Sequence, residues 1–556
     1  MEPSNASHGW DGKMASCDDS EDDDYRPART AFHEDPAVCT YMLGTVTATV
    51  PLKIAASQIA SPGSGLFVTK DIMDGEEIFR SQIPFVCVEP YQTTVCHYCL
   101  EDTGSRIHHE EGRFCAGDDV TAATKRCSGC RVARFCSTAC HKRAWKAFHK
   151  DECKILKDAP PIPAHHLIAY RILFWQNRDL VTSGMGKALN LLENHFVDYL
   201  ADSDEATHIY EVAMAIRQMT QTKLALRAVW RLVPAIMTNA IGIRSAGRKE
   251  PHALGLDLVA SVINHSCDPN AFVFHEGGKI HVRSLRPICA GEEITVSYVA
   301  MPTDVYHRRL ALKKEHFFDC YCKRCSDEHK EHTEMFDRDP TKLNKLHQAQ
   351  DDILRLLIDT NKALLQSTPP HRAFDVDNAE TSLRTITCQA FPPGDWPAHI
   401  DPLPHARLTL ALLYSRRDDK PRPALLNALR GTLPTTRYHR AGPDWVANLL
   451  DLARILLVVT GATATTTSVC VTPPEAMLLA CGILGRLRAE AAGVFGLESG
   501  FVVAVGKLHD SLAGMVAEVV PGTKPGTGEF EKEFVRVQGK LLAWAGIDEI
   551  HGVSLP

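Results

Sequence analysis

Eight residues whose types and mutual spacing suit zinc ligands lie within one stretch of 58 residues. Two cysteines separated by two or three residues can face the same tetrahedral ion, and a histidine can replace one of them. The eight residues form four such pairs, enough for two closed sites with no position left for water or substrate. They are Cys96, Cys99, Cys127, Cys130, Cys136, Cys140, His149 and Cys153. We predict two structural zinc sites.

Two other interpretations of these cysteines explain the pattern less well. A disulfide framework is typical of small secreted domains, but the N-terminal segment is polar and acidic, without the apolar stretch of a secretory signal. A redox pair at Cys96 and Cys99 would not explain why the pattern continues in register to Cys153. Cys115 lies in the long interval before Cys127, and we do not expect it to be a ligand.

Several short motifs are spread over the middle of the chain. Gly63–Leu66 carries two glycines typical of a turn. Asn264–Asn270 follows the apolar run Leu258–Ile263, where we expect a loop to leave a buried strand. Gly291–Tyr298 comes next, followed by a cysteine cluster. Three of its cysteines need a fourth ligand to close a zinc site, and the unpaired cysteine of the earlier loop is the candidate. The four are Cys267, Cys320, Cys322 and Cys325.

In this order the motifs resemble a SET domain with its post-SET zinc site, and residues 96–153 resemble a MYND zinc finger. Over about residues 45–326 the chain is therefore similar to the SET-and-MYND family of protein-lysine methyltransferases. The resemblance implies small curved sheets around a knot-like crossing. It also implies that S-adenosylmethionine and a target lysine enter a narrow channel from opposite faces.

The resemblance implies particular cofactor contacts. The turn at Gly63 would cradle the methionine end, because glycine lets the backbone approach a ligand closely. Asn239 would contact the same end, although its position also suits a turn or helix cap. His265 would help to hold the adenosine, although it could equally be a buried structural histidine. The implied cofactor-binding residues are Gly63, Ser64, Gly65, Asn239, Ser261, Ile263, Asn264, His265 and Phe318.

Tyr298 matches the catalytic tyrosine of the family, and its alternative is a packed aromatic at a strand end. Its hydroxyl would orient the lysine amine toward the methyl group, so catalysis would depend on position and not on a dedicated general base. The chain departs from the family at His316, where most members carry a second tyrosine. An imidazole can line the channel or accept a hydrogen bond, but it cannot reproduce a phenol wall.

Composition excludes several classes of protein. A net charge of −7 is too mild for a chain that binds nucleic acid along its whole surface. The segment Lys125–Lys154 is different, because it holds nine Lys or Arg against Asp151 and Glu152. This excess suits an acidic partner, or it balances anionic zinc–thiolate centres. The best apolar run, Leu449–Val459, is interrupted by charges, so we expect no membrane span.

The predicted fold class is α+β, with a SET-type β-fold, an inserted MYND zinc finger, a helical insert, a post-SET zinc site and an all-α, repeat-like C-terminal domain. Strands are expected at 45–50, 66–68 and 77–79, and a hairpin at 272–282. Helices are expected at 139–149 and 209–233, at 343–364, and near 405–416, 445–458, 475–491 and 530–545. The predicted divisions are a disordered tail at 1–44, SET segments at 45–95 and 250–300, the finger at 96–153, a helical insert at 154–249, a post-SET region at 301–328 and a helical domain at 329–556.

Two functions from different classes follow. The first is an S-adenosylmethionine-dependent lysine methyltransferase acting on histone or other proteins. The second is a non-catalytic scaffold that binds proteins in transcriptional regulation. Three zinc ions are expected in either case. The finger would bind proline-containing peptides or, with weaker support, nucleic acid, and alternatively it only supports the SET domain. We expect the protein in the nucleus and the cytoplasm.

Overall fold

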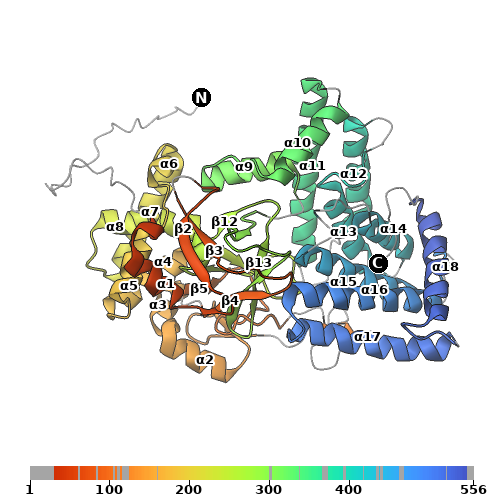
Figure 1. Cartoon of the computed structure of the whole chain (residues 1–556), viewed down its shortest axis with the longest axis horizontal. Helices are drawn as coiled ribbons and strands as arrows, with labels where there is room; N and C mark the ends of the chain where they lie inside the picture. The colour runs from red at the N-terminus through yellow and green to blue at the C-terminus, as the bar shows by residue number, and fades with distance from the viewer. Residues whose placement is uncertain are drawn as a thin grey trace, which may run out of the picture.

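The structure is a computed structural model whose strand-rich part and helical tail lie side by side (Figure 1). It describes residues 31–60, 63–82, 85–103, 107–108, 113–114, 124–158, 161–299, 303–336, 338–365, 374–391, 396–417, 419–433, 438, 442–461, 469–520 and 522–547. Cys115 and residues 1–30 of the predicted tail lie outside these ranges.

The predicted disordered tail ends earlier than expected. Phe32–Glu34 forms a 3₁₀ turn, η1, and Pro36–Leu43 forms helix α1. Asp35 caps α1 by accepting from the backbone N–H groups of Ala37 and Val38, and proline opens the helix. The prediction of disorder to residue 44 is therefore wrong for residues 32–43. Composition averaged over the acidic segment concealed a short apolar stretch that begins at Phe32.

Antiparallel strands form the body of the SET region. The largest sheet has the order β1-β4-β14-β13, a second has β10-β11-β5, and β2 pairs with β3. The expected hairpin is present, with Glu276 opposite Lys279 and with φ of +59° and +79° at Gly277 and Gly278. The strands are β1 (Thr47–Ala48), β2 (Leu52–Ala56), β3 (Ser64–Val68), β4 (Glu77–Ser81), β5 (Phe85–Val88), β10 (Ile241–Ile243), β11 (Ala253–Leu256), β13 (Ala271–Glu276) and β14 (Lys279–Ser284).

A crossing of two distant segments lies at the centre of the SET region. Strand β12 (Asn264–His265) pairs in parallel with β15 (Thr295–Val296). Asn270 fastens the crossing: its Nδ2 donates to the Glu293 carbonyl at 2.8 Å, and its Oδ1 accepts from the Thr295 backbone N–H at 2.7 Å. Because this side chain is 1% exposed, water cannot replace these hydrogen bonds.

The segment before this crossing differs from its prediction. Leu258–Ile263 was expected to be a buried strand, but Ala260–Val262 forms a 3₁₀ turn, η4. The carboxylate of Asp257 accepts from the backbone N–H groups of Val259 and Ala260, and this side-chain cap starts the turn. An apolar run of this length does not distinguish a strand from another buried segment.

The finger and the helical insert interrupt the SET strands. The finger contains β6 (Ile107–His108), β7 (Arg113–Phe114), β8 (Lys125–Arg126), β9 (Arg134–Phe135), α2 (Thr138–Ala144), the π-helical turn η3 (Trp145–His149) and α3 (Lys150–Asp158). The insert contains α4 (Ala164–Asn177), α5 (Ser183–Leu191), α6 (Phe196–Leu200), α7 (Ser203–Thr220) and α8 (Leu226–Asn239). The helix expected at 209–233 is therefore two helices, with Gln221 in the left-handed conformation between them.

The tail consists of helices packed in sequence. All five helical stretches predicted here fall within α11, α13, α15, α16 or α18 to within two residues, whereas no range was predicted for α9, α10, α12, α14 or α17. The helices are α9 (Val305–His316), α10 (Lys323–Met335), α11 (Pro340–Leu365), α12 (Val376–Ala390), α13 (Leu403–Tyr414), α14 (Pro421–Thr432), α15 (Pro443–Gly461), α16 (Pro473–Phe495), α17 (Gly500–Val519) and α18 (Gly528–Ala545).

By length and composition alone, α17 could cross a membrane, whereas we expected no such segment. The helix nevertheless packs against α16 within the tail, and residues such as Phe501, Val505 and Leu512 are buried there. Core helices of folded domains can have the same length and apolar composition, so α17 is weak support for a membrane span.

The SET region and the tail share a packed boundary. Phe272 and Phe274 of β13 belong to the hydrophobic core of the tail, and the Phe274 ring lies 5.1 Å from that of Phe495. The Lys249 ammonium lies 2.9 Å from the carboxylate of the fully buried Asp451. Apolar packing and an ion pair therefore both hold the tail against the SET region.

Candidate functional site

One cavity of about 2520 Å³ brings together nearly all the residues predicted to bind the cofactor or act in catalysis. Gly65 is the exception and lies just behind its wall. The cavity extends from the Gly63 turn, past Tyr298, to the boundary with α13 and α15. Segments far apart in sequence meet here because β12 and β15 cross beside the β2–β3 hairpin.

Asn264 and Glu293 hold the glycine turn. The Asn264 amide Nδ2 donates to the Ser64 carbonyl at 2.9 Å and to Glu293 Oε1 at 2.6 Å. Glu293 also accepts from the Ser57 hydroxyl and the Gln58 backbone N–H. At Gly65, a Cβ would lie 2.4 Å from Glu293 Oε1, so this position admits only glycine without movement of the carboxylate. Gly65 therefore leaves the space that the Glu293 carboxylate occupies next to the turn.

Asn239 and Ser261 lie on the insert side of the cavity. Asn239 Nδ2 donates to the carbonyls of Glu193 and Ala235, at 2.5 and 2.8 Å. The Ser261 hydroxyl donates to the Asp257 carbonyl at 2.7 Å. Both side chains thus stabilise the chain around them as well as lining the cavity.

Tyr298, His265 and Ile263 form a connected group. The Tyr298 hydroxyl donates to the Ile263 carbonyl at 2.7 Å, and its backbone N–H donates to His265 Nδ1 at 3.0 Å. Burial and the Glu293 carboxylate raise the pKa of Tyr298, so the phenol remains protonated at neutral pH. The hydroxyl is consequently a fixed, neutral group in the wall of the cavity.

His265 also links this group to the post-SET cysteines. Burial lowers the pKa of His265 to about 3, so the ring is neutral. Since Nδ1 accepts a hydrogen bond, the proton of the neutral ring is on Nε2, which lies 3.1 Å from the Cys267 sulfur. The ring therefore has a structural role even if it also contacts a ligand.

His316 lies beside Tyr298, with ring centroids 4.8 Å apart. Burial and the nearby His195 lower the pKa of His316 to about 4. Its Nδ1 is buried, and no described residue forms a hydrogen bond with it. The ring centroids of Phe318 and His265 are 5.8 Å apart. The wall next to Tyr298 thus contains an uncharged imidazole with an unused nitrogen.

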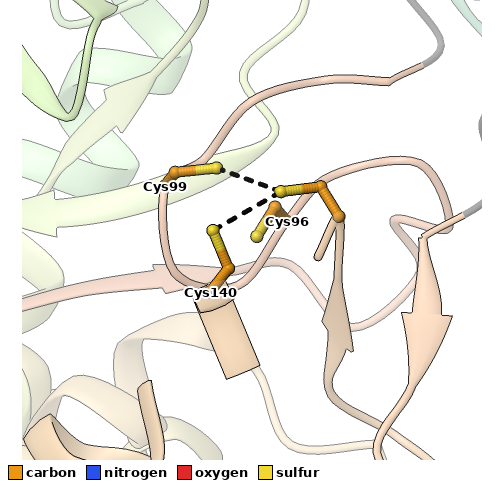
Figure 2. A group of neighbouring side chains, drawn as sticks. Cys96, Cys99 and Cys140 are labelled. Carbon is orange, nitrogen blue, oxygen red and sulfur yellow. Dashed lines mark hydrogen bonds between the residues drawn. The ribbon is translucent and has the colours of Figure 1, made fainter. Parts of the chain in front are cut away.

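The eight finger residues form two groups that interleave along the sequence. Figure 2 shows Cys96, Cys99 and Cys140 directed toward one another. The potential ligand atoms of each group lie within 4.8 Å of one another. Sulfur–sulfur distances of 3.5–3.9 Å within the groups suit a tetrahedral ion, whose sulfurs lie roughly 3.8 Å apart for bonds of ~2.3 Å. The groups are Cys96, Cys99, Cys136 and Cys140, and Cys127, Cys130, His149 and Cys153.

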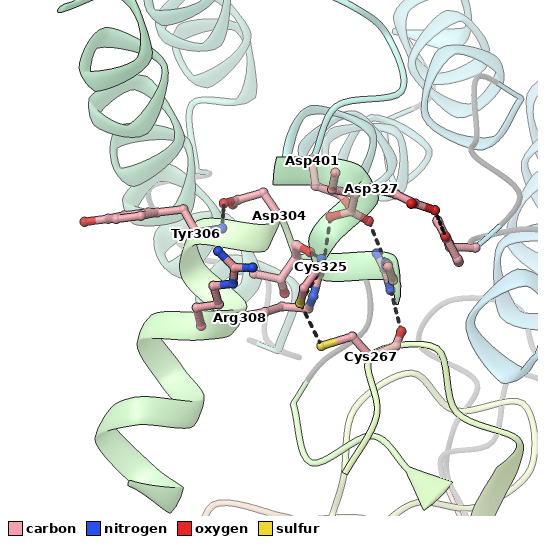
Figure 3. Close-up of polar contacts among 12 residues, drawn as sticks. Cys267, Asp304, Tyr306, Arg308, Cys325, Asp327 and Asp401 are labelled. Carbon is pink, nitrogen blue, oxygen red and sulfur yellow. Dashed lines mark hydrogen bonds and ion pairs between the residues drawn. The ribbon is translucent and has the colours of Figure 1, made fainter. Parts of the chain in front are cut away.

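Cys267 joins the three post-SET cysteines, as predicted for the unpaired cysteine of the earlier loop. Its sulfur lies 3.5 Å from that of Cys325 (Figure 3). Arg308 and Arg324 are both fully buried beside this group: Arg308 donates to the Cys325 sulfur at 3.6 Å, and Arg324 to the Cys267 carbonyl at 3.4 Å. The two cations share Glu328. Their excess positive charge suits a site of four thiolates around a divalent ion.

Three residues contribute to the site in ways that their sequence context does not predict. Glu293 lies within a recognised motif, yet nothing in the motif indicates that its carboxylate supports the glycine turn. Asn270 ends the motif Asn264–Asn270 without a predicted role, and it fastens the crossing. His33 comes from the segment predicted to be disordered and contacts Ser64.

Comparison with known proteins agrees with this geometry. The SET domain family model matches residues 63–299. Human histone-lysine N-methyltransferase SMYD3 is 29% identical over 291 residues, which cover 50% of this chain and 63% of SMYD3. Histone-lysine N-methyltransferase ASHR1 of Arabidopsis thaliana is 30% identical over 290 residues, 50% of this chain and 56% of ASHR1. SET domain and MYND-type zinc finger protein 6 of Schizosaccharomyces pombe is 26% identical over 281 residues, 50% of this chain and 52% of that protein.

Each match thus spans 52–63% of the relative's own length. The similarity supports the predicted resemblance and the SET fold with its cysteine clusters and helical tail.

Proposed function

We propose that this chain, which resembles the SET-and-MYND family over about half of its length, is an S-adenosylmethionine-dependent protein-lysine N-methyltransferase that acts on histone or other proteins. The observation that supports this most is the Tyr298 hydroxyl. It is fixed on the Ile263 carbonyl inside the cavity that also contains the turn held by Asn264.

The residues around the cavity suit this cofactor. Gly63 and Ser64 present backbone to the cavity, the ring of Phe318 supplies an apolar surface near His265, and Tyr298 lies in the same cavity. When bound, the cofactor supplies a methyl group already activated on a sulfonium. The chain then needs only to hold the amine and that methyl group in line, and such positioning accounts for much of the barrier in reactions of this kind.

Tyr298 orients the amine, and the channel helps to deprotonate it. The hydroxyl is neutral and fixed, so it can accept a hydrogen bond from the amine without a change in its own charge. A lysine with a pKa of ~10.4 requires roughly 4–5 kcal/mol to become neutral at pH 7. Removal from water lowers that pKa, and the neutral His316 adds no charge that would oppose entry of an ammonium.

A binding measurement tests the proposal without knowledge of the substrate. The zinc-loaded chain is titrated with S-adenosylmethionine by calorimetry, together with Asn264→Ala and with Asn378→Ala, an exposed asparagine on α12, as a matched control. We expect micromolar binding by the wild type and the control, and a loss of at least about tenfold for Asn264→Ala. Absence of binding by the folded, zinc-replete wild type would contradict the enzyme and favour the scaffold.

The exposed face of the finger supports a second role in partner binding. Its basic residues are mostly exposed, whereas Glu152 is buried on Arg171 at 2.7 Å and Asp151 pairs with Arg178 at 2.5 Å. The local acidic residues therefore do not neutralise this surface. We propose that it takes part in binding proline-containing peptides with acidic flanks, and that the protein works in both nucleus and cytoplasm. If added nucleic acid displaced such a peptide from the finger, the weaker alternative of nucleic-acid binding would be favoured.

A further inference from the structure

The segment Ala31–Glu34 forms part of the cavity wall, although it precedes the SET strands in sequence. Its 3₁₀ turn packs against β2, and α1 then packs against α5 of the helical insert. Gly184 of α5 permits this contact, because a Cβ there would lie 2.5 Å from the Tyr41 ring of α1. The N-terminal segment thus contacts two elements that line the cavity, β2 and α5.

Local contacts also hold the segment in one conformation. The Phe32 side chain is 7% exposed and belongs to the SET core. The Cys39 thiol donates to the Phe32 carbonyl at 3.1 Å, and the Glu34 carboxylate accepts from the Ala31 backbone N–H at 3.0 Å. The position of His33, between these anchors, is therefore well determined.

His33 forms two hydrogen bonds with Ser64. Its backbone N–H donates to the Ser64 hydroxyl at 3.1 Å, and its ring Nδ1 lies 3.0 Å from the same oxygen. When the hydroxyl donates its proton to Nδ1, the neutral ring carries its own proton on Nε2. No described residue accepts from that Nε2. The partly exposed ring therefore has a spare donor at the wall of the cavity.

The glycine turn lacks a cation of its own. Residues 57–65 contain no lysine or arginine, and the Ser64 side chain is already engaged by His33. A ligand that presents a carboxylate at this turn needs a donor from another element. His33 is the imidazole that reaches the turn.

We propose that His33 is a cofactor-binding residue whose Nε2–H donates to the carboxylate at the methionine end of S-adenosylmethionine. The inference rests on the proposed function, since it requires the cofactor to bind with that end at Gly63–Gly65. It assigns to the N-terminal segment a specific part in cofactor recognition. The Ser64 hydroxyl then serves to fix the imidazole, and the turn contributes through its backbone.

Two probes that differ only at the amino-acid end test this assignment. S-adenosylhomocysteine has the carboxylate, whereas 5′-methylthioadenosine lacks the whole amino-acid end. Their dissociation constants are measured for the wild type, His33→Ala, His33→Gln and the matched control His399→Ala, which is in the tail. Since a hydrogen bond to a charged group is involved, we expect His33→Ala to weaken S-adenosylhomocysteine binding roughly 10- to 100-fold and to leave methylthioadenosine binding unchanged. His33→Gln should recover part of the loss, because its amide can donate.

The outcomes separate this inference from the proposed function. If the wild type binds neither probe, the cofactor assignment fails first. If it binds both and His33→Ala weakens both equally, the residue only supports the turn and the inference is overturned. Unchanged binding of both probes by His33→Ala overturns it as well. Thermal unfolding of each variant shows whether the segment has remained docked.

Discussion

At the scale of single residues, Tyr298 and His316 share one wall of the cavity, with ring centroids 4.8 Å apart. One ring has its polar atom fixed on a backbone carbonyl, and the other has a buried Nδ1 without a partner among the described residues. This contrast gives each residue a distinct test.

Tyr298→Phe removes the hydroxyl and keeps the ring. We expect the rate of methyl transfer to fall by about 100-fold or more, because the group that orients the amine is lost. Cofactor affinity should change by less than about threefold. Single-turnover transfer to a lysine-containing protein mixture and calorimetry with the cofactor provide the two numbers. Similar losses in both would show that Tyr298 packs against the cofactor and does not orient the amine.

His316→Gln tests whether the imidazole titrates during the reaction. The pKa of His316 is lowered to about 4, so the ring is neutral throughout the range from pH 6 to pH 9. Glutamine cannot titrate, and we therefore expect the pH–rate profiles of the variant and the wild type to have the same shape in that range. A wild-type inflection near pH 6.5 that disappears in the variant would make His316 an acid or base in the reaction.

At the scale of secondary-structure elements, the β2–β3 hairpin depends on a carboxylate from another strand region. Glu293 fills the space beside Gly65 and receives hydrogen bonds from Ser57, Gln58 and Asn264. The turn at Gly63–Gly65 is therefore held by an element more than 220 residues away in sequence.

Gly65→Ala should displace Glu293, because the added Cβ would lie 2.4 Å from Oε1. We expect cofactor affinity to fall at least about tenfold and the free energy of unfolding to fall by about 1–3 kcal/mol. Gly514→Ala in α17 is the matched control, since nothing lies within 4 Å of its added Cβ. Calorimetry and chemical denaturation measure the two effects. If Gly65→Ala behaved like the control, Glu293 would not be confined as described.

Helix α9 is joined to α11 through a histidine. His307 Nδ1 lies 2.6 Å from Asp304 and Nε2 lies 2.7 Å from Asp351. Burial opposes the charged ring, but the hydrogen bonds and charges of Asp304 and Asp351 outweigh it and raise the pKa of His307. The ring bridges the post-SET region and the tail most strongly when it is protonated.

The stability contributed by this bridge should depend on pH in a defined direction. A raised folded-state pKa means that the contribution is complete below the unfolded value of ~6.5 and is lost as pH rises through the folded value. We expect His307→Gln to reduce the free energy of unfolding by about 1 kcal/mol more at pH 6 than at pH 9. His329→Gln, an exposed position on α10, is the control. A larger difference at pH 9 would contradict the assignment.

At the scale of the whole molecule, three cysteine-rich groups join segments that strands and helices alone would leave loosely connected. The finger groups interleave, and the post-SET group ties the loop after β12 to the start of α10. In each case the free energy of ion binding would stabilise a small module that has few apolar contacts of its own.

Metal analysis of the purified chain should give three zinc ions per molecule. Cys267→Ser should give two, together with reduced thermal stability and weakened cofactor binding, because His265 and Arg324 both contact this residue. Cys289→Ser, an exposed cysteine outside the groups, should retain all three ions. Two ions in the wild type, or three in Cys267→Ser, would remove the post-SET site.

The sequence determined the local part of this picture. Ligand spacing identified eleven of the residues in the three cysteine-rich groups, the Gly277–Gly278 turn identified its hairpin, and apolar periodicity identified five of the ten helices α9–α18. These signals are local, because a zinc pair, a turn with positive φ and a helix face each arise from residues a few positions apart.

Only the tertiary structure decided which distant residues meet. It paired Cys96 and Cys99 with Cys136 and Cys140, placed Glu293 behind Gly65 and brought His33 from a segment predicted to be disordered to Ser64. Nothing in the spacing of these residues indicates such contacts, because chain connectivity does not limit which segments a fold brings together. They result from the crossing of β12 and β15 and from the burial of Phe32, whose energies depend on packing over the whole SET core.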